Sequence, residues 1–400
     1  MSLWTSKDKS ERACAERRKK AQQLRAVLTK LGVTFIKLGQ FLSVRRDILP
    51  LEFVEELSLL QDKVPPFAFV EVRTTVEHEL EAKLNEIFCS FESEPMASAS
   101  IGQVHKATLK NGQAVAVKVQ RANLAQVINQ DLAFLRSLFR AAKAINIKGD
   151  WDSWFSLIDE FGQCLLAEID YLQEGRNADH LRQVLRNFPA IIIPRIFWRY
   201  TTRRVITEEL CEGVKIDKIS LLKDIDLKRL AKQIVDAYLE QMMVHGYFHA
   251  DPHAGNLAVT NEGKLIIYDF GMVSHLSEGQ QQGMIKLIHG VIDNNISGFI
   301  EALEQMGIIR AISRQDKEYL LTIIEPIWVY CHTASTEEID LLHLEKEINV
   351  LLRNRYFQLP ANLAYLIRMI VALEAIVRTL NPNFNFIRAA SPYFRALLVS

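Results

Sequence analysis

The chain has 400 residues, of which 49% are hydrophobic, and it carries 48 basic and 48 acidic side chains. A chain of this length is expected to form about two to three domains. Its balanced charge lacks the strongly basic character of a nucleic-acid-binding protein, so no nucleic acid partner is expected. The five cysteines are scattered and form no CxxC or Cys/His pattern. We therefore expect neither a disulfide framework nor a zinc site, and a reducing compartment is favoured.

The sequence predicts neither an exported protein nor a membrane-spanning one. The first residues, MSLWTSKDKSERACAERRKKAQQ, contain no apolar stretch and include acids, unlike a secretory signal or a transit peptide. The apolar stretch from Leu359 to Leu380 contains charges that would be costly in lipid, so we expect a buried helix there. Those charges are Arg368, Glu374 and Arg378. A cytoplasmic protein is the resulting expectation.

Residues 1–92 are predicted to be helical. Apolar residues recur at helical spacing over 24–31, and Gly32 is expected to end this helix. A second helix is expected over about 34–44. The basic run that starts at Arg17 either contacts anionic lipid or, as is more common for such runs, forms a solvated helix face.

The sequence changes from helical to strand character near residue 93. Segments 103–109 and 114–120 have strand character, and Asn111–Gly112 between them predicts a hairpin. Two long helices are expected next, at about 123–147 and 152–183. The second of these carries a continuous apolar stripe.

The remaining chain is predicted to be mainly helical. Strand character returns over 190–210, and a further strand-like patch lies at 264–270. A small β-containing lobe followed by a larger helical lobe is an α+β arrangement. We therefore expect a helical extension at 1–92, an N-lobe at 93–210 and a C-lobe at 211–400.

The segment with the clearest chemical meaning is HADPHAGN, which is followed downstream by DFG. Phosphoryl transfer by kinases needs a carboxylate near the acceptor and two oxygen ligands for Mg²⁺. Asp251, Asn256 and Asp269 occur at the spacing of these three residues in kinases. The alternative is a polar turn between two core elements, but the combined spacing favours a catalytic and metal-binding site.

Two features of HADPHAGN refine this interpretation. His249 and His253 are expected to form structural hydrogen bonds and not a metal pair, because Pro252 between them works against a shared helix face. Ala250 stands where kinases commonly have the arginine that contacts a phosphorylated activation loop. We therefore expect no regulation through such a loop.

Lys118 ends the segment VAVK and matches the strand lysine that contacts the α- and β-phosphates of ATP. A solvated lysine at the end of an ordinary strand is the alternative. In kinases this lysine is held by a helix carboxylate. The segment AEIDYLQEGRNA offers three candidates, and periodicity does not choose among them. The candidates are Glu168, Asp170 and Glu174.

Four motifs together resemble the UbiB-type (AarF-like) atypical kinases of the protein-kinase-like superfamily. They are KLGQ at 37–40, ASASIGQVHKA at 97–107, AEIDYLQEGRNA at 167–178, and HADPHAGN with DFG. The resemblance extends from about residue 20 to at least residue 290. KLGQ and the alanine-rich segment are the diagnostic pair, because ordinary protein kinases lack both.

This resemblance assigns roles to individual residues. It implies that Glu174 pairs with Lys118, and that Glu168 and Asp170 face the helix that carries Lys37 and Gln40. It also implies that this helix covers the nucleotide cleft. The phosphate loop would consist of Ala97, Ser98, Ala99 and Ser100. Fuller family members carry an apolar C-terminal segment that this sequence lacks, so no integral membrane anchor is expected.

The resemblance implies a two-lobed protein-kinase-like α+β fold that binds ATP or ADP with Mg²⁺. The expected activity is that of an atypical kinase or ATPase supporting isoprenoid quinone biosynthesis, with peripheral membrane contact. The acceptor would be a small or lipid-like molecule, such as a quinone precursor, or water, because no APE motif follows DFG. The alternatives are a nucleotide-binding scaffold for lipid or quinone enzymes, and a small-molecule phosphotransferase, which should lack KLGQ.

Overall fold

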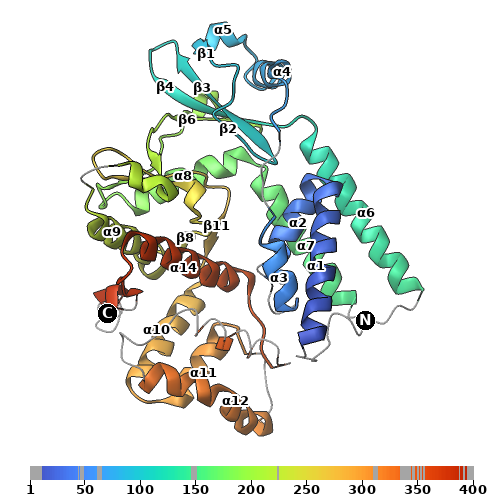
Figure 1. The fold of residues 1–400 in the computed structure, drawn as a ribbon, viewed down its shortest axis with the longest axis vertical. Coiled ribbons are helices and arrows are strands. Elements are labelled where there is room, and N and C mark those ends of the chain that lie inside the picture. Colours follow the sequence, from blue (N-terminus) through green and yellow to red (C-terminus); the bar gives the residue numbers. More distant parts are fainter. Residues whose placement is uncertain are drawn as a thin grey trace. The chain divides into compact units, whose positions relative to one another are not determined.

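Two compact units make up the chain in the computed structural model, and Figure 1 labels most of its helices and several of its strands. One unit is Met1–Asp179 with Pro194–Cys211, and the other is His180–Ile193 with Glu212–Ser400. The structure describes residues 11–43, 45, 49–60, 65–145, 151–222, 225–309, 314–333, 344, 347–348, 351, 354, 356–386, 388–390 and 392–393.

The first unit contains a helical layer built from amphipathic segments. Helices α1 (Glu11–Leu31) and α2 (Val33–Ser43) meet at Gly32, whose φ of +99° suits glycine, so the predicted helix end is confirmed. Helix α3 (Leu51–Leu57) packs on α1, and α6 (Leu124–Ala144) packs on α7 (Trp151–Glu168). Their buried apolar side chains form one continuous core.

The basic run of α1 pairs with acidic residues of α3. Arg17 lies 2.8 Å from Glu52, and Arg18 lies 2.5 Å from Glu55. Arg17 and Glu52 are largely buried in their ion pair, whereas Arg18 and Glu55 form their pair at the exposed surface.

The first unit also contains an antiparallel sheet. Its strands are β1 (Phe88–Phe91), β2 (Ala97–Ser98), β3 (Gly102–Leu109), β4 (Ala114–Gln120) and β6 (Val205–Glu209), in the order β1-β3-β4-β6 with β2 beside β3. The predicted β3–β4 hairpin is confirmed, and Gly112 in its turn has a φ of +84°. Helices α4 (Phe69–Glu79) and α5 (Leu84–Ile87) precede this hairpin, and Val72 and Val76 of α4 pack in the apolar cluster of the sheet.

The helix predicted at 152–183 is wrong as a single element. The structure has α7 and then α8 (Tyr171–Val184), which are separated by Ile169 and Asp170. Asp170 Oδ1 accepts the backbone N–H of Leu172 at 3.0 Å, as residues that cap the start of a helix do. The apolar stripe of α7 runs up to the buried Ile169 at the break itself. Periodicity alone therefore could not reveal where α7 ends.

The second unit is mainly helical. Its helices are α9 (Leu227–Leu239), the π-helical turn η3 (Glu240–Val244), α10 (Glu278–Ile292), α11 (Ile296–Gln305), α12 (Arg314–Thr333) and α14 (Ala361–Leu380). Helix α14 packs on α9, and its buried residues include Met369 and Leu373, which confirms the buried helix predicted near the end of the chain. None of the helices that the structure describes combines the length and apolarity needed to cross a bilayer.

The second unit has more strands than predicted. Strands β5 (Ile191–Ile192), β7 (Val214–Lys215), β9 (Leu257–Val259) and β10 (Leu265–Ile267) form a sheet in the order β5-β10-β9-β7, and β8 (Tyr247–His249) pairs with β11 (Val273–His275). Strand β10 coincides with the predicted patch at 264–270, and β5 lies in the segment predicted to have strand character over 190–210. Strands of two or three residues show too little alternation to be recognised in a sequence. Short 3₁₀ turns complete the described chain: η1 (Trp198–Tyr200), η2 (Ile216–Leu221) and η4 (Ala254–Asn256).

Candidate active site

In the first unit, the ammonium group of Lys118 is enclosed by two carboxylates. Its Nζ donates to Glu174 Oε1 at 2.5 Å and lies 3.6 Å from Glu208 Oε1. The side chains of Lys118, Glu174 and Glu208 are 13%, 5% and 4% exposed. Charges this deeply buried persist in proteins when they are paired. The structure thus brings Lys118 together with Glu174, one of the three acids that the sequence offered.

Glu208 is a member of this cluster that the sequence analysis missed. Strand β6 pairs Ile206 with Lys118, and side chains two residues apart on a strand share a face. Glu208 therefore lies on the same face of the sheet as Lys118. The available signal was an acidic residue at an alternating position of the strand-like segment RRVITEEL.

The KLGQ motif lies on α2. Lys37 Nζ forms a largely buried ion pair with Glu168 Oε1 at the end of α7, and Gln40 Nε2 donates to the carbonyl of Leu60 at 3.2 Å. A Cβ atom at Gly39 would lie only 2.2 Å from Leu60 Cδ1. The motif therefore combines a long-range ion pair with a close approach of backbone to a neighbouring side chain.

Asp170 has a different position from Glu168, although the resemblance placed both acids against the KLGQ helix. Asp170 accepts the backbone N–H of Leu172, and its Oδ2 lies 3.7 Å from Arg203 Nε. Glu168 is the acid that pairs with Lys37. The structural role of Asp170 is thus to begin α8, the helix that carries Glu174.

The alanine-rich loop leads into β3. Ala97 and Ser98 form β2 on the edge of β3, and Arg121 Nε donates to the carbonyl of Ser100 at 3.1 Å. A longer bond of 3.4 Å joins Arg121 Nη2 to the carbonyl of Ala99. Arg121, which the sequence analysis did not single out, therefore holds the backbone of this loop.

In the second unit, HADPHAGN connects β8 to β9 through η4. The carbonyl of Asp251 accepts Asn256 Nδ2 at 3.3 Å, which leaves Asn256 Oδ1 without a hydrogen-bond partner among the residues described. The N–H of Tyr268 donates to the carbonyl of Asn256 at 2.8 Å. Because β9 and β10 pair antiparallel, Asn256 and the start of the DFG segment lie at the same end of this hairpin.

Asp269 adopts an uncommon backbone conformation. Its φ is +57°, in the left-handed region that non-glycine residues rarely occupy outside turns and functional sites. Its Oδ1 accepts the N–H of Gly271 at 3.1 Å, and its carbonyl lies 2.7 Å from His249 Nε2. The side chain of Asp269 is exposed, so its carboxylate is accessible to a ligand.

His249 supports this turn from inside the unit. Burial lowers the pKa of its imidazole, so a neutral ring with its proton on Nε2 donates to the carbonyl of Asp269. The ring packs edge-on against Phe270 with 6.0 Å between centroids. His253 is exposed, and its Nδ1 accepts the N–H of Gly255 at 2.9 Å. Both histidines thus form hydrogen bonds within this segment.

Asp251 has a partner that the sequence analysis did not foresee. Arg368 Nη2 of α14 donates to Asp251 Oδ1 at 2.9 Å. The sequence showed Arg368 only as a charge within an apolar helix. Its pairing with Asp251 gives this charge a partner outside its own helix.

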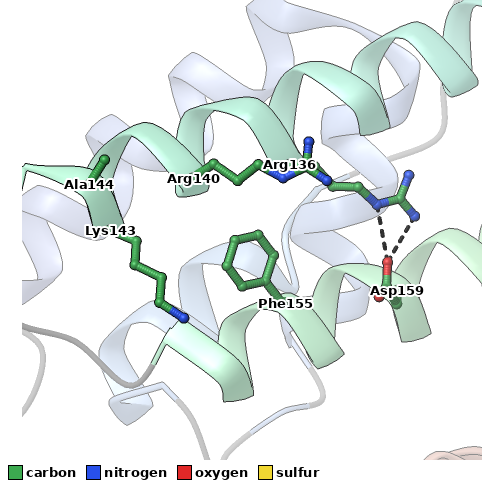
Figure 2. Close-up of a pocket in the computed structure, with 6 residues that line it drawn as sticks. All are labelled: Arg136, Arg140, Lys143, Ala144, Phe155 and Asp159. Atoms are coloured by element: carbon green, nitrogen blue, oxygen red, sulfur yellow. Dashed lines mark hydrogen bonds and ion pairs between the residues drawn. The ribbon is translucent and has the colours of Figure 1, made fainter.

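A surface hollow of about 630 Å³ lies between α6 and α7 of the first unit (Figure 2). Arg136 pairs with Asp159 there at 2.8 Å, and Lys143 Nζ lies 6.0 Å from the ring centroid of Phe155. None of the residues that line it is a predicted site residue. They are Arg136, Arg140, Lys143, Ala144, Phe155 and Asp159.

Comparison with known proteins places this fold and these motifs in one class, the atypical kinases. The family model described as the ABC1 atypical kinase-like domain matches residues 59–303. The chain belongs to this ABC1 atypical kinase family, which confirms the family resemblance and the kinase-like α+β fold.

Curated relatives include an uncharacterised protein of Synechocystis, which is 36% identical over 97% of this chain and 69% of the relative. The Arabidopsis thaliana protein named ACTIVITY OF BC1 COMPLEX KINASE 8, chloroplastic, is 35% identical over 97% of this chain. The chain spans only 55% of that protein's length. Rv3197 of Mycobacterium tuberculosis, solved as a complex with erythromycin, has a TM-score of 0.62 and 26% identity, over 96% of this chain and 98% of its own.

Proposed function

We propose that this chain is an atypical kinase or ATPase that uses ATP with Mg²⁺ and acts on a small or lipid-like acceptor, or on water. The observation that carries this proposal is the buried ion pair between Lys118 of β4 and Glu174 of α8. A strand lysine held by a helix glutamate is the arrangement with which kinases position the phosphates of ATP.

The chemistry of Asn256 and Asp269 fits a divalent metal. Asn256 Oδ1 has no hydrogen-bond partner among the described residues, and the Asp269 side chain is exposed. Mg²⁺ prefers oxygen ligands of these two kinds. When bound, the metal supplies positive charge that offsets the charge of the phosphates.

The remaining site residues have separate tasks in this proposal. Lys118 orients the phosphates, and Glu174 holds Lys118. Asp251 accepts the proton of an acceptor hydroxyl or positions a water molecule. The loop over 97–100 approaches the phosphates through its backbone, and the extension over 1–92 restricts access by protein acceptors.

A small acceptor is favoured by the short connection that follows DFG. Strand β11 follows almost directly, and α10 begins at Glu278 with Ser277 as its cap. This leaves little chain for the long activation loop that binds peptide substrates in many kinases. Family membership supports the further proposal that the reaction serves isoprenoid quinone metabolism beside a membrane.

The proposal is tested by measuring ADP formation by the purified chain with Mg²⁺, with and without anionic liposomes and a quinone-precursor mimic. We expect Mg²⁺-dependent turnover that Asp251→Asn removes. Asp217→Asn, at an exposed position of η2, should retain it. Nucleotide binding without any turnover by the wild type would instead favour a scaffold. Turnover stimulated only by a soluble amine or alcohol would favour a small-molecule phosphotransferase.

A further inference from the structure

Arg368 reaches the proposed catalytic carboxylate from an element far along the chain. It lies on α14 and donates to Asp251 Oδ1 at 2.9 Å, although the two residues are 117 positions apart in the chain. Asp251 Oδ2 lies 3.9 Å from His253 Nε2. Within the described part of the chain, Arg368 is therefore the permanently charged side chain that contacts Asp251.

The guanidinium group of Arg368 retains unused hydrogen-bond donors. A guanidinium carries five N–H donors in a planar fork, and one bond to Asp251 is the contact that Arg368 makes with other described residues. Its side chain is 36% exposed, against 20% for Asp251. The rest of the fork can therefore bind a second acceptor beside the carboxylate.

Helix α14 holds Arg368 in a fixed position. Asn362 at the start of α14 donates to the carbonyl of His275 at 3.0 Å and to Gln280 Oε1 at 2.6 Å. Met369 and Leu373 on the same helix are buried. A cation held in this way needs little reorganisation when negative charge develops next to it.

The geometry points to a cation for the transferred phosphoryl group: Arg368 binds an oxygen of that group while it orients Asp251. This inference rests on the proposed function. An oxygen bonded to the second N–H of the same nitrogen, Nη2, would lie at most roughly 6 Å from Asp251 Oδ1, two hydrogen-bond lengths away. That distance accommodates the acceptor oxygen next to Asp251 and the phosphorus that it attacks.

In the transfer step, the bond between the γ-phosphorus and the β–γ bridging oxygen breaks, and ADP leaves with the electron pair. A new P–O bond forms to the acceptor oxygen, and the acceptor proton passes to Asp251. Arg368 stabilises the negative charge on the phosphoryl oxygens during this exchange, as an arginine supplied in cis does in some nucleotide hydrolases.

The test compares Arg368→Gln and Arg368→Lys with Arg378→Gln. Arg378 is a matched control because it lies on the same helix and pairs with the buried Glu374 at 2.7 Å, away from Asp251. Two quantities are measured for each protein. The first is the change in kcat compared with the change in KM for ATP. The second is the affinity for Mg-ADP with and without aluminium fluoride, a mimic of the transferring phosphoryl group.

We expect Arg368→Gln to lower kcat by roughly 100-fold or more with little change in KM, because one charge-stabilising donor is lost. Its affinity for Mg-ADP should match that of the wild type. Aluminium fluoride should raise this affinity in the wild type but not in the variant. Arg368→Lys keeps the positive charge beside Asp251, so it is the variant to use if Arg368→Gln fails to fold. Its activity should also be low, because an ammonium lacks the planar fork of donors. Arg378→Gln should keep the kcat and the aluminium fluoride affinity of the wild type, although the loss of its pair with the buried Glu374 lowers the stability of the fold.

Three outcomes would overturn the inference. Wild-type values of kcat and aluminium fluoride affinity in both Arg368 variants would reduce the Asp251 contact to a structural ion pair. Faster turnover in the variants would make Arg368 an inhibitory contact. A wild-type protein that binds no Mg-ADP would refute the proposed function itself, and the inference with it.

Discussion

Lys118 Nζ donates to Glu174 Oε1 at 2.5 Å, although 56 positions separate the two residues in the chain. Strand β4 supplies the lysine and α8 supplies the acid, and Asp170 fixes where that helix begins. Both charges are buried, and Glu208 lies close to the same ammonium group. The stability of the first unit therefore depends on keeping this cluster intact.

Lys118→Ala is expected to destabilise the chain by about 3–5 kcal/mol, because it leaves buried carboxylates without their cation. Glu174→Gln should recover part of this loss in the double variant, since the amide is neutral. Urea unfolding of the two single variants and the double variant gives the coupling energy. Additive effects would show that Glu174 is not the functional partner of Lys118. Glu208 would then be the next acid to examine.

A pH effect is expected from His105 on β3. Its side chain is fully buried, with 2.8 Å between Nδ1 and the carbonyl of Glu92 and 3.0 Å between Nε2 and Gln103 Nε2. A proton on Nδ1 satisfies Glu92, so Nε2 must accept from the amide of Gln103. A second proton, on Nε2, would point at the N–H of the Gln103 amide, so that two donors would face each other. Burial accordingly lowers the pKa of this histidine below its ordinary value.

Because the folded state resists this proton, the unfolded chain binds it first as the pH falls. The contribution of His105 to stability is therefore complete above about pH 6.5 and is lost progressively below it, by at most about 1.4 kcal/mol per pH unit. Urea unfolding of the wild type and of His105→Gln between pH 7.5 and pH 5 measures the difference. A difference that stays constant with pH would contradict this account.

The KLGQ helix gives a prediction about local opening. Replacing Lys37 and Gln40 together by alanine removes the ion pair to Glu168 and the bond to the carbonyl of Leu60. We expect faster amide exchange in α2 and in the last turns of α7, together with a changed affinity for ATP. Hydrogen exchange measured by mass spectrometry, with and without nucleotide, reports both segments.

The matched control replaces Gln23 and Lys30, which are exposed on α1, by alanine. It should leave exchange in α2 and α7 unchanged. If the Lys37 and Gln40 variant also exchanges and binds nucleotide as the wild type does, then KLGQ is only part of an amphipathic helix. The proposal that it restricts access to the site would then be abandoned.

Local patterns predicted much of the fold. Helical spacing of apolar residues located α1, and Asn111–Gly112 located the β3–β4 hairpin. The break at Asp170 escaped notice because the apolar stripe continues to Ile169 while the capping carboxylate leaves no trace in periodicity. Most strands of the second unit were too short to show alternation.

Motif spacing singled out Lys118, Asp251 and Asp269, but it could not find the residues that approach them from elsewhere. Glu208 and Arg368 belong to no motif. Strand pairing brings Glu208 to Lys118, and helix α14 brings Arg368 to Asp251. In the sequence, Glu208 was visible only as a charge at an alternating strand position, and Arg368 only as a charge in an apolar helix. Turning such traces into contacts requires the tertiary structure.

In the proposed function, nucleotide binding depends on a metal held by Asp269. A thermal-shift titration with ATP, in Mg²⁺ and separately in a chelator, tests it in the wild type, in Asp269→Asn and in the control Asp217→Asn. A ligand that binds only the folded chain raises its Tm as the ligand concentration rises. We expect a Mg²⁺-dependent rise in the wild type and the control, and none in Asp269→Asn, because an amide replaces the carboxylate ligand. An equal rise in Asp269→Asn, or no rise in the wild type, would contradict it.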